Sequence, residues 1–205
     1  MIPFTESLRY EFPLESRSFV IDVGSYQLNW AEAIVRKYGC RVDAYEPIKR
    51  FYSEAGKRMH ATAEIEVMKR IRQYNLGVAG AMGGAQEMHV QNDSSGAFAT
   101  SPETEMVTMI PIAKAVKVAG VRMIDLLKLN CEGAEYDILS SLLTSNDEFG
   151  HAIERFRHLM VQFHQCVPNF EEKYNAIAGD LTHTHELQWR EPFVWECWKL
   201  KTVSP

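Results

Sequence analysis

The sequence lacks the features that mark a membrane-spanning, secreted or metal-dependent protein. No window of its 205 residues is apolar enough for a transmembrane helix, and its N-terminus carries charges too early for a signal peptide. The four cysteines lie far apart without C-x-x-C spacing, so neither a disulfide framework nor a zinc site is indicated. His183 and His185 alternate without a third ligand, and we expect no metal site. These absences predict a cytoplasmic protein, with association to a membrane surface still open.

Concentrated positive charge is missing as well. Lys and Arg total 22 against 27 Asp and Glu, which gives a net charge of −5, and no basic cluster exceeds a few residues. Because binding through phosphate contacts needs a basic patch, nucleic acid is not the expected partner. The chain contains no repeat or low-complexity linker, and 46% hydrophobic residues are ordinary for a folded protein. The sequence predicts one domain over 1–205, with an irregular lead-in over 1–17.

The sequence does contain a buried strand that runs directly into a turn and a helix. Residues 19–30 read F-V-I-D-V-G-S-Y-Q-L-N-W, and helical spacing of apolar residues continues from Trp30 to Tyr38, with Gly39 as the stop. Proteins of the α/β class commonly hold a nucleotide at such a corner. A purely structural interpretation is also open, since any strand that turns sharply into a helix favours glycine.

A carboxylate follows the next predicted strand, over 42–45. Glu46 lies 46 minus 24, or 22, residues after Gly24, near the ~20 at which an acidic side chain reaches a ribose in dinucleotide folds. A carboxylate suits that role because it accepts hydrogen bonds from two vicinal hydroxyls at once. We interpret Glu46 as a ribose ligand, and a solvated loop glutamate is the alternative.

The rest of the chain continues the alternation of strands and helices. The pattern predicts a helix over 48–59, a strand over 71–75, a β-hairpin insertion over 79–112, a strand over 123–129, a helix over 136–143, a strand over 158–164, a helix over 169–181 and a closing antiparallel pair over 186–190 and 193–200. The insertion is a plausible rim for a substrate pocket. Trp189, Trp195 and Trp198 in the closing pair favour core packing, and a homodimer surface is the alternative.

Polar residues gather after the strand over 123–129. Lys128, Asn130, Glu132 and Glu135 lie within K-L-N-C-E-G-A-E, at the carboxyl end of a strand that should neighbour the first. A buried charge is costly without a partner, so either a pairing of Lys128 with a glutamate or a functional role would explain the lysine. His164 closes a later strand at the same edge. Its near-neutral pKa suits it to accept a proton from a substrate hydroxyl, although hydrogen bonding within the fold is the other explanation.

Four segments, taken in order, resemble the FkbM-type S-adenosylmethionine-dependent methyltransferases. They are V-I-D-V-G-S-Y-Q-L-N-W, A-Y-E-P, D-L-L-K-L-N-C-E-G-A-E-Y-D-I-L and V-Q-F-H, within about residues 19–164. The resemblance implies an α/β class I methyltransferase fold, with a Rossmann-like seven-stranded mostly parallel sheet and a C-terminal antiparallel hairpin. It also implies S-adenosyl-L-methionine as cofactor and O-methylation of a hydroxyl on a small molecule, a sugar, or a glycolipid or polyketide-like compound.

The resemblance assigns roles to single residues. The methionine portion of the cofactor would lie on the turn made by Asp22, Gly24, Ser25 and Tyr26, and the ribose hydroxyls on Glu46. The adenine would be flanked by Pro47, Asn75 and Leu76. Asn130 would sit near the methionine amino group or the transferred methyl. For catalysis we assign the general base to His164, with Lys128 or Glu132 orienting the acceptor.

Two positions depart from the family pattern. Leu28 stands where a second glycine is usual, and we expect it to be tolerated because the position lies inside the helix. Asn130 stands where the family has aspartate, which removes a charge that would pair with the cofactor's ammonium. A catalytically silent, methyltransferase-like binding or scaffold protein is therefore one alternative. An NAD-dependent oxidoreductase is another, although G-S-Y-Q-L lacks the later glycines that let a pyrophosphate approach the backbone.

Overall fold

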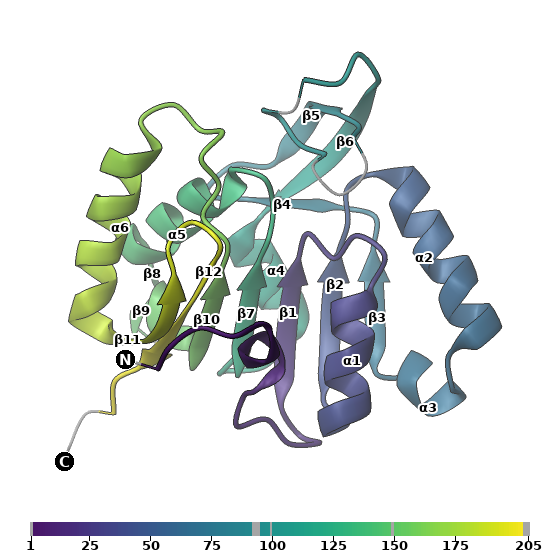
Figure 1. Ribbon diagram of the computed structural model, residues 1–205, viewed down its shortest axis with the longest axis horizontal. Coiled ribbons are helices and arrows are strands. Elements are labelled where there is room, and N and C mark those ends of the chain that lie inside the picture. The colour runs from purple at the N-terminus through teal and green to yellow at the C-terminus, as the bar shows by residue number, and fades with distance from the viewer. Residues whose placement is uncertain (1, 92–94, 99, 149, 203–205) are drawn as a thin grey trace.

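A seven-stranded sheet forms the centre of the molecule (Figure 1). The computed structural model describes residues 2–91, 95–98, 100–148 and 150–202. In spatial order the strands are β11 (His185–Glu191), β12 (Trp195–Leu200), β10 (His158–Val161), β7 (Leu126–Leu129), β1 (Phe19–Val23), β2 (Arg41–Tyr45) and β3 (Ile71–Tyr74). Within this sheet β12 alone runs antiparallel to its neighbours. The architecture is thus the predicted mostly parallel sheet closed by an antiparallel hairpin.

Helices cover both faces of this sheet, which explains why its central strands are apolar on both sides. The helical segments are η1 (Glu6–Tyr10), α1 (Asn29–Tyr38), α2 (Lys49–Thr62), α3 (Ile65–Met68), α4 (Ile112–Ala119), α5 (Ala134–Thr144), η3 (Ala152–Arg155) and α6 (Phe170–Thr184). Ile21 and Val23 of β1 face the core that includes residues of α4, α5 and α6, whereas Val20 faces the core shared with α1. All five residues of β1 are buried.

The sequence suggested that Leu28 lies inside helix α1. In the structure it is instead the N-cap residue, just before the helix begins. The helix begins at Asn29, and the φ of Leu28 is +63°, in the left-handed region that favours glycine. The side chain is only 1% exposed and packs in the core beside Trp30 and Ala31. Hydrophobic burial therefore holds a leucine in a backbone conformation that costs roughly 1 kcal/mol for a residue with a Cβ.

We expect Leu28→Gly to be at least as stable as Leu28→Ala. Both variants lose the buried side chain, at a cost of about 3 kcal/mol, but only glycine relieves the left-handed strain. The usual order is the reverse, because glycine elsewhere costs roughly 0.5–1 kcal/mol more than alanine. Chemical denaturation of the two variants measures the difference. A glycine variant clearly less stable than the alanine variant would show that Leu28 is unstrained.

A second, three-stranded sheet lies at the upper right of Figure 1, beyond the carboxyl ends of β1 and β2. It consists of β4 (Gly77–Ala79), β6 (Thr104–Pro111) and β5 (Gly84–His89), with β5 and β6 antiparallel. Met88 and Met109 of this sheet pack against Phe51 of α2 in a separate small core. A short pair, β8 (Asn146–Asp147) and β9 (Gly150–His151), completes the strands among the described residues. The extended runs expected within 79–112 therefore form a hairpin joined by β4.

The N-terminal lead-in and the closing hairpin share one core. Phe12, Trp189 and Trp195 are buried there, and the indole Nε1 of Trp30 donates to the carbonyl of Arg9 at 2.8 Å. Trp198 is buried on the other face of the sheet. The prediction that the hairpin tryptophans are core residues is confirmed, so they leave no aromatic face of the kind on which a homodimer was considered. Among the described residues, no helix is long and apolar enough to cross a bilayer.

Some predicted boundaries are wrong. Helix α4 was missed, because residues 112–119 were assigned partly to an extended run and partly to no element. The strand expected over 158–164 ends at Val161, so His164 lies beyond it. Apolar residues run from β6 directly into α4, and Phe163 resumes the apolar pattern after β10, so composition alone does not mark either boundary.

Candidate cofactor and active site

The loops that follow β1 and β7 cross at Gly24. Its φ is +76°, and a Cβ added there would lie 1.7 Å from the backbone oxygen of Asn130. The N–H groups of Gly24 and Ser25 both donate to the carbonyl of Tyr45 at 3.1 Å. The N–H of Asn130 in turn donates to the carbonyl of Val23 at 3.0 Å. These bonds tie the carboxyl ends of β1, β2 and β7 into one corner that requires glycine both for its dihedral and for the close approach.

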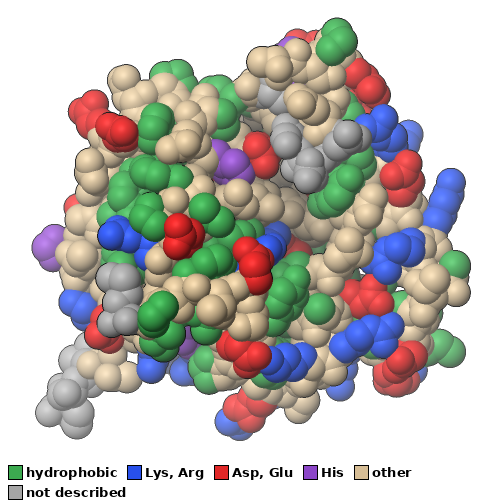
Figure 2. Space-filling model, viewed as in Figure 1, with side chains coloured by type: hydrophobic (Ala, Val, Ile, Leu, Met, Phe, Trp, Pro, Cys, Tyr) green, Lys and Arg blue, Asp and Glu red, His purple; other side chains and the backbone are tan. Residues whose placement is uncertain are grey.

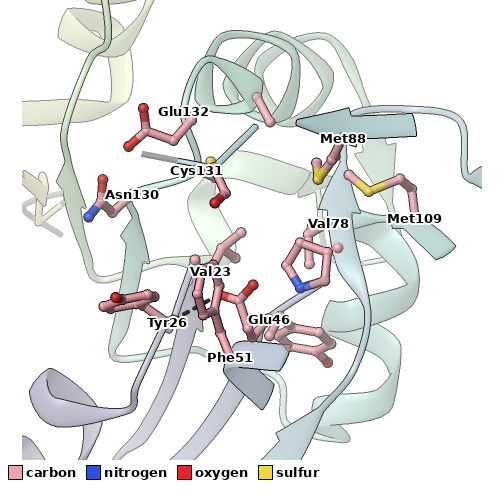
Figure 3. A pocket seen from close by; sticks show the side chains of 16 residues that line it. Val23, Tyr26, Glu46, Phe51, Val78, Met88, Met109, Asn130, Cys131 and Glu132 are labelled. Carbon is pink, nitrogen blue, oxygen red and sulfur yellow. Dashed lines mark hydrogen bonds between the residues drawn. The ribbon is translucent and has the colours of Figure 1, made fainter. Parts of the chain in front are cut away.

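Glu46 lies at the carboxyl end of β2 and is held by backbone donors. Its Oε2 accepts a hydrogen bond from the N–H of Tyr26, and its Oε1 accepts one from the N–H of Ile48, both at 2.9 Å. The residue is 5% exposed. Burial raises the pKa of the Glu46 carboxyl to about 7, against the opposing effect of these two bonds. The carboxylate is thus fixed in orientation at the floor of a pocket (Figure 3).

That pocket opens above the carboxyl ends of β1, β2 and β7 and has a volume of about 660 Å³, its open mouth included. Six of the residues predicted to act in the site line it: Gly24, Tyr26, Glu46, Pro47, Asn130 and Glu132. In Figure 3, Tyr26 and Glu46 lie on one side, and Asn130, Cys131 and Glu132 lie on the opposite side. Residues separated by about a hundred positions in the sequence therefore line one pocket, which is the arrangement expected at a topological switch point.

The apolar wall of the pocket was not predicted. It is built by Phe51 of α2, Val78 of β4, Met88 of β5 and Met109 of β6 (Figure 3). The two extended runs did carry a signal for this wall. In a strand, side chains at every second position face the same side of the sheet, and Met88 and Met109 each occupy such a position in their run. Figure 2 shows the surface hollowed below this small sheet. An apolar wall in the same pocket as a fixed carboxylate suits a ligand with a flat base and a polar sugar.

Asn75 and Leu76 are not on the pocket wall, although they were predicted to flank an adenine. The amide Nδ2 of Asn75 donates to the carbonyls of Glu46 and Pro47, at 3.0 and 2.8 Å. Leu76 packs against the main core. The residues that reach the pocket from this segment are Gly77 and Val78. Asn75 therefore supports the loop that carries Glu46 rather than contacting the pocket itself.

Lys128 is paired with Asp22, and not with a glutamate. Its Nζ lies 2.6 Å from Oδ1 of Asp22 and 3.0 Å from the carbonyl of Gly24, and its side chain is 4% exposed. Lys128 is not among the residues that line the pocket, so its role in orienting an acceptor stays a prediction. The pair satisfies a buried charge and fixes the turn after β1, a structural role that depends on both partners.

His164 faces two carboxylates. Its Nδ1 lies 3.1 Å from Oε1 of Glu135, which also accepts a bond from the backbone N–H of His164 at 2.8 Å. Its Nε2 lies 3.0 Å from Oε1 of Glu132, an ion-pair contact without hydrogen-bond alignment. Burial by itself lowers the pKa of His164, but the two carboxylates outweigh burial and raise it to about 9. An imidazole protonated at neutral pH cannot accept a proton, which argues against His164 as the general base.

Fold and site together define a class of protein. A sheet of this order, with a glycine turn after β1 and a buried carboxylate after β2 at one pocket, is that of class I methyltransferases. Structures with this fold include the methyltransferase FkbM of Methylobacillus flagellatus KT, at a TM-score of 0.60 and 15% identity, covering 93% of this chain and 45% of that one. The chain thus spans less than half of that protein's length. A Clostridium thermocellum protein named for rRNA methylation matches at a TM-score of 0.58 and 9% identity, covering 94% of this chain and 91% of that one.

The chain belongs to the FkbM methyltransferase family. Its residues 22–189 match the methyltransferase FkbM domain. A Streptococcus pneumoniae protein named for tRNA methylation shares the fold at a TM-score of 0.53 and 12% identity, covering 98% of this chain and 72% of that one. No curated protein is detectably similar in sequence. At these identities the solved structures establish the fold, and the family match establishes the methyltransferase class.

Proposed function

We propose that the chain is an S-adenosylmethionine-dependent O-methyltransferase that acts on a hydroxyl of a small molecule, sugar, or glycolipid or polyketide-like acceptor. The observation that carries the proposal is Glu46, a buried carboxylate held by two backbone N–H groups in the pocket that Gly24 and Asn130 also line. Each oxygen of a carboxylate accepts more than one hydrogen bond. Glu46 therefore keeps acceptor capacity for the two ribose hydroxyls of a nucleoside.

The residues at the other end of the pocket fit the remainder of this cofactor. Within the described part of the chain, the Oδ1 of Asn130 is buried without a hydrogen-bond partner. A buried acceptor of this kind costs free energy until a donor reaches it. The ammonium of the methionine portion is such a donor. When bound, the cofactor would supply an activated methyl group, and the protein would supply positioning of the acceptor.

The kind of methyl acceptor that we propose follows from the polarity of the pocket and from the charge of the chain. Glu132 brings a carboxylate to the pocket, which suits a protic acceptor such as a hydroxyl. Two of the similar structures are named for RNA methylation, but the net charge of this chain is −5. A negative protein without a basic cluster is poorly suited to a polyanionic acceptor. A neutral hydroxylated compound is therefore favoured.

Calorimetry followed by a transfer assay tests the proposal. Titration with S-adenosylmethionine, S-adenosylhomocysteine and NADH should show binding of the first two and none of the third. Transfer of a labelled methyl group is then measured on a panel of methyl glycosides, glycolipids and hydroxylated polyketides. Binding of NADH in place of S-adenosylmethionine would contradict the proposal. Binding of S-adenosylmethionine without transfer to any member of the panel would favour the silent alternative.

Asn130→Asp tests the silent alternative directly, since the missing aspartate is the observation that favours it. The new carboxylate would meet the cofactor's ammonium with an ionic hydrogen bond, so we expect S-adenosylmethionine to bind about tenfold more tightly. Asn130→Ala is the matched control, because it removes the unpartnered Oδ1 and should weaken binding. If Asn130→Asp changes neither affinity nor turnover, Asn130 does not contact the methionine portion.

A further inference from the structure

The loop between β7 and α5 is wound around one buried carboxylate. Glu135 is 0% exposed. Its Oε2 accepts a hydrogen bond from the N–H of Gly133 at 2.9 Å, and its Oε1 accepts one from the N–H of His164 at 2.8 Å. The same Oε1 lies 3.1 Å from Nδ1 of His164. Glu135 therefore fixes both the loop that precedes α5 and the imidazole of His164, which follows β10.

Glu132 is the member of this cluster that reaches the pocket. Its side chain is 22% exposed, whereas that of His164 is 11% exposed and that of Glu135 is fully buried. Within the described residues, Oε1 of Glu132 contacts His164 Nε2, and Oε2 accepts no hydrogen bond. One oxygen of Glu132 thus contacts His164, and the residue itself lines the pocket.

The backbone of Glu132 is held in an unfavourable conformation. Its φ is +50°, in the left-handed region that residues other than glycine rarely adopt. Strain of this kind persists only where the surroundings impose it, and it clusters at functional sites. The hairpin of the small sheet closes over the same residue, because a Cβ added to Gly96 would lie 2.8 Å from Cβ of Glu132. Glu132 therefore lies where the main-sheet loops meet the hairpin that borders the pocket.

We propose that Glu132 is the general base of the methyl transfer, and that His164 and Glu135 are positioning residues that hold its carboxylate in the pocket. This inference rests on the proposed function. The acceptor's O–H bond breaks and its proton passes to Oε2 of Glu132. The oxygen electron pair forms the bond to the methyl carbon, and the electron pair of the broken carbon–sulfur bond stays on sulfur. The positive charge lost at sulfur is thereby balanced by the proton gained at the carboxylate.

This assignment differs from the one expected from the sequence, in which His164 was the general base and Glu132 oriented the acceptor. The His164 cation supplies the charge that keeps Glu132 in place, and Glu135 supplies the two contacts that keep His164 in place. Lys128 does not take part, because its ammonium is committed to Asp22 and the carbonyl of Gly24. Among the described residues of this cluster, Glu132 is the one that lines the pocket.

Binding of two probes of different charge tests the proposal without knowledge of the acceptor. A base that reaches the acceptor oxygen must lie within about 8 Å of the sulfonium, given near-attack and hydrogen-bond distances. At that range a carboxylate favours cationic S-adenosylmethionine over neutral-sulfur S-adenosylhomocysteine by about tenfold. Glu132→Gln should abolish this preference. Glu46→Gln is the matched control, since it should weaken both probes equally and leave the preference unchanged.

The positioning roles have a separate readout. In the wild-type protein the imidazole of His164, followed by NMR, should titrate with a midpoint near its pKa of about 9. In Glu132→Gln the midpoint should fall toward neutrality. If Glu132→Gln is not folded, Glu132→Ala serves for both measurements.

The outcomes separate this proposal from the one it rests on. If the wild-type protein binds neither probe, the cofactor assignment fails, and the assignment of Glu132 as the general base fails as well. If the wild type binds both probes and Glu132→Gln keeps the wild-type preference, Glu132 is not the base, although the cofactor assignment stands. A wild-type His164 that titrates at an ordinary midpoint would likewise overturn the positioning roles.

Discussion

Gly24→Ala is expected to destabilise the protein by more than about 3 kcal/mol and to abolish binding of S-adenosylmethionine. The new Cβ would lie 1.7 Å from the backbone oxygen of Asn130, and neither backbone segment can yield without breaking the corner. The carbonyl of Gly24 also accepts a hydrogen bond from Lys128, so displacement would strain the buried ion pair. Chemical denaturation and calorimetry measure the two losses.

Gly120→Ala is the matched control for this variant. Gly120 has a φ of +66°, close to the +76° of Gly24, but the nearest atom to an added Cβ is the carbonyl oxygen of Val118 at 3.9 Å. The Gly120→Ala variant therefore measures only the cost of placing an alanine in the left-handed conformation, roughly 1 kcal/mol. If Gly24→Ala is no less stable than Gly120→Ala, the loops after β1 and β7 separate easily and the corner is not rigid.

Glu46→Gln is expected to weaken S-adenosylmethionine binding ten- to a hundredfold, the range for losing hydrogen bonds to a charged group. Glutamine cannot accept from both Tyr26 and Ile48, because one of its terminal atoms is itself a donor. The wild-type affinity should also depend on pH. Since the pKa of Glu46 is about 7, affinity should fall by up to about tenfold between pH 8 and pH 6. This decrease should be absent in Glu46→Gln.

The folding stability should change with pH in the opposite sense. The pKa of Glu46 rises from 4.5 in the unfolded chain to about 7 in the fold, because burial disfavours the charged form. Between these values the unfolded state loses its proton first. Raising the pH from 4.5 to 7 therefore destabilises the fold, by about 3 kcal/mol for this group. The pH at which the fold is most stable is thus not the pH at which the cofactor binds best.

Glu196 provides the control that separates these two effects. It is 1% exposed and its pKa is also about 7, raised by burial, but it lies away from the pocket beside Tyr174 and Trp198. Glu196→Gln should remove the contribution of Glu196 to the pH dependence of folding stability. It should leave the pH dependence of cofactor binding intact. An affinity that is independent of pH in the wild type would show that Glu46 does not meet the ribose in its ionised form.

The positions at the ends of the parallel strands were predictable from the sequence. Gly24, Glu46 and Asn130 each follow an apolar run of β type, and a parallel sheet brings such positions to one edge. Their convergence on one pocket follows from strand order alone. The buried tryptophans of the closing hairpin were predictable for a similar reason, because period-two spacing of aromatics marks a packed face.

Properties set by neighbours distant in sequence were not predictable. The charge of His164 depends on Glu132 and Glu135, which approach it only in the folded chain. His185 lies in the polar stretch T-H-T-H-E of the sequence but is 1% exposed, with Nε2 3.0 Å from the carbonyl of Phe156. The left-handed conformation of Leu28 is likewise imposed by packing, since nothing in its own chemistry favours it. Tertiary contacts override local preference at each of these positions.

The hydrogen bonds around the pocket differ greatly in how much chain they enclose, and this bears on the order in which the site forms. Tyr26 and Glu46 are 20 residues apart, whereas Lys128 and Asp22 are 106 apart. Short loops close with less loss of chain entropy and so form sooner. We therefore expect the ribose end to take shape with the first strand–helix–strand unit. The methyl end would follow only when β7 docks, so that nucleoside recognition precedes catalytic competence as the chain folds.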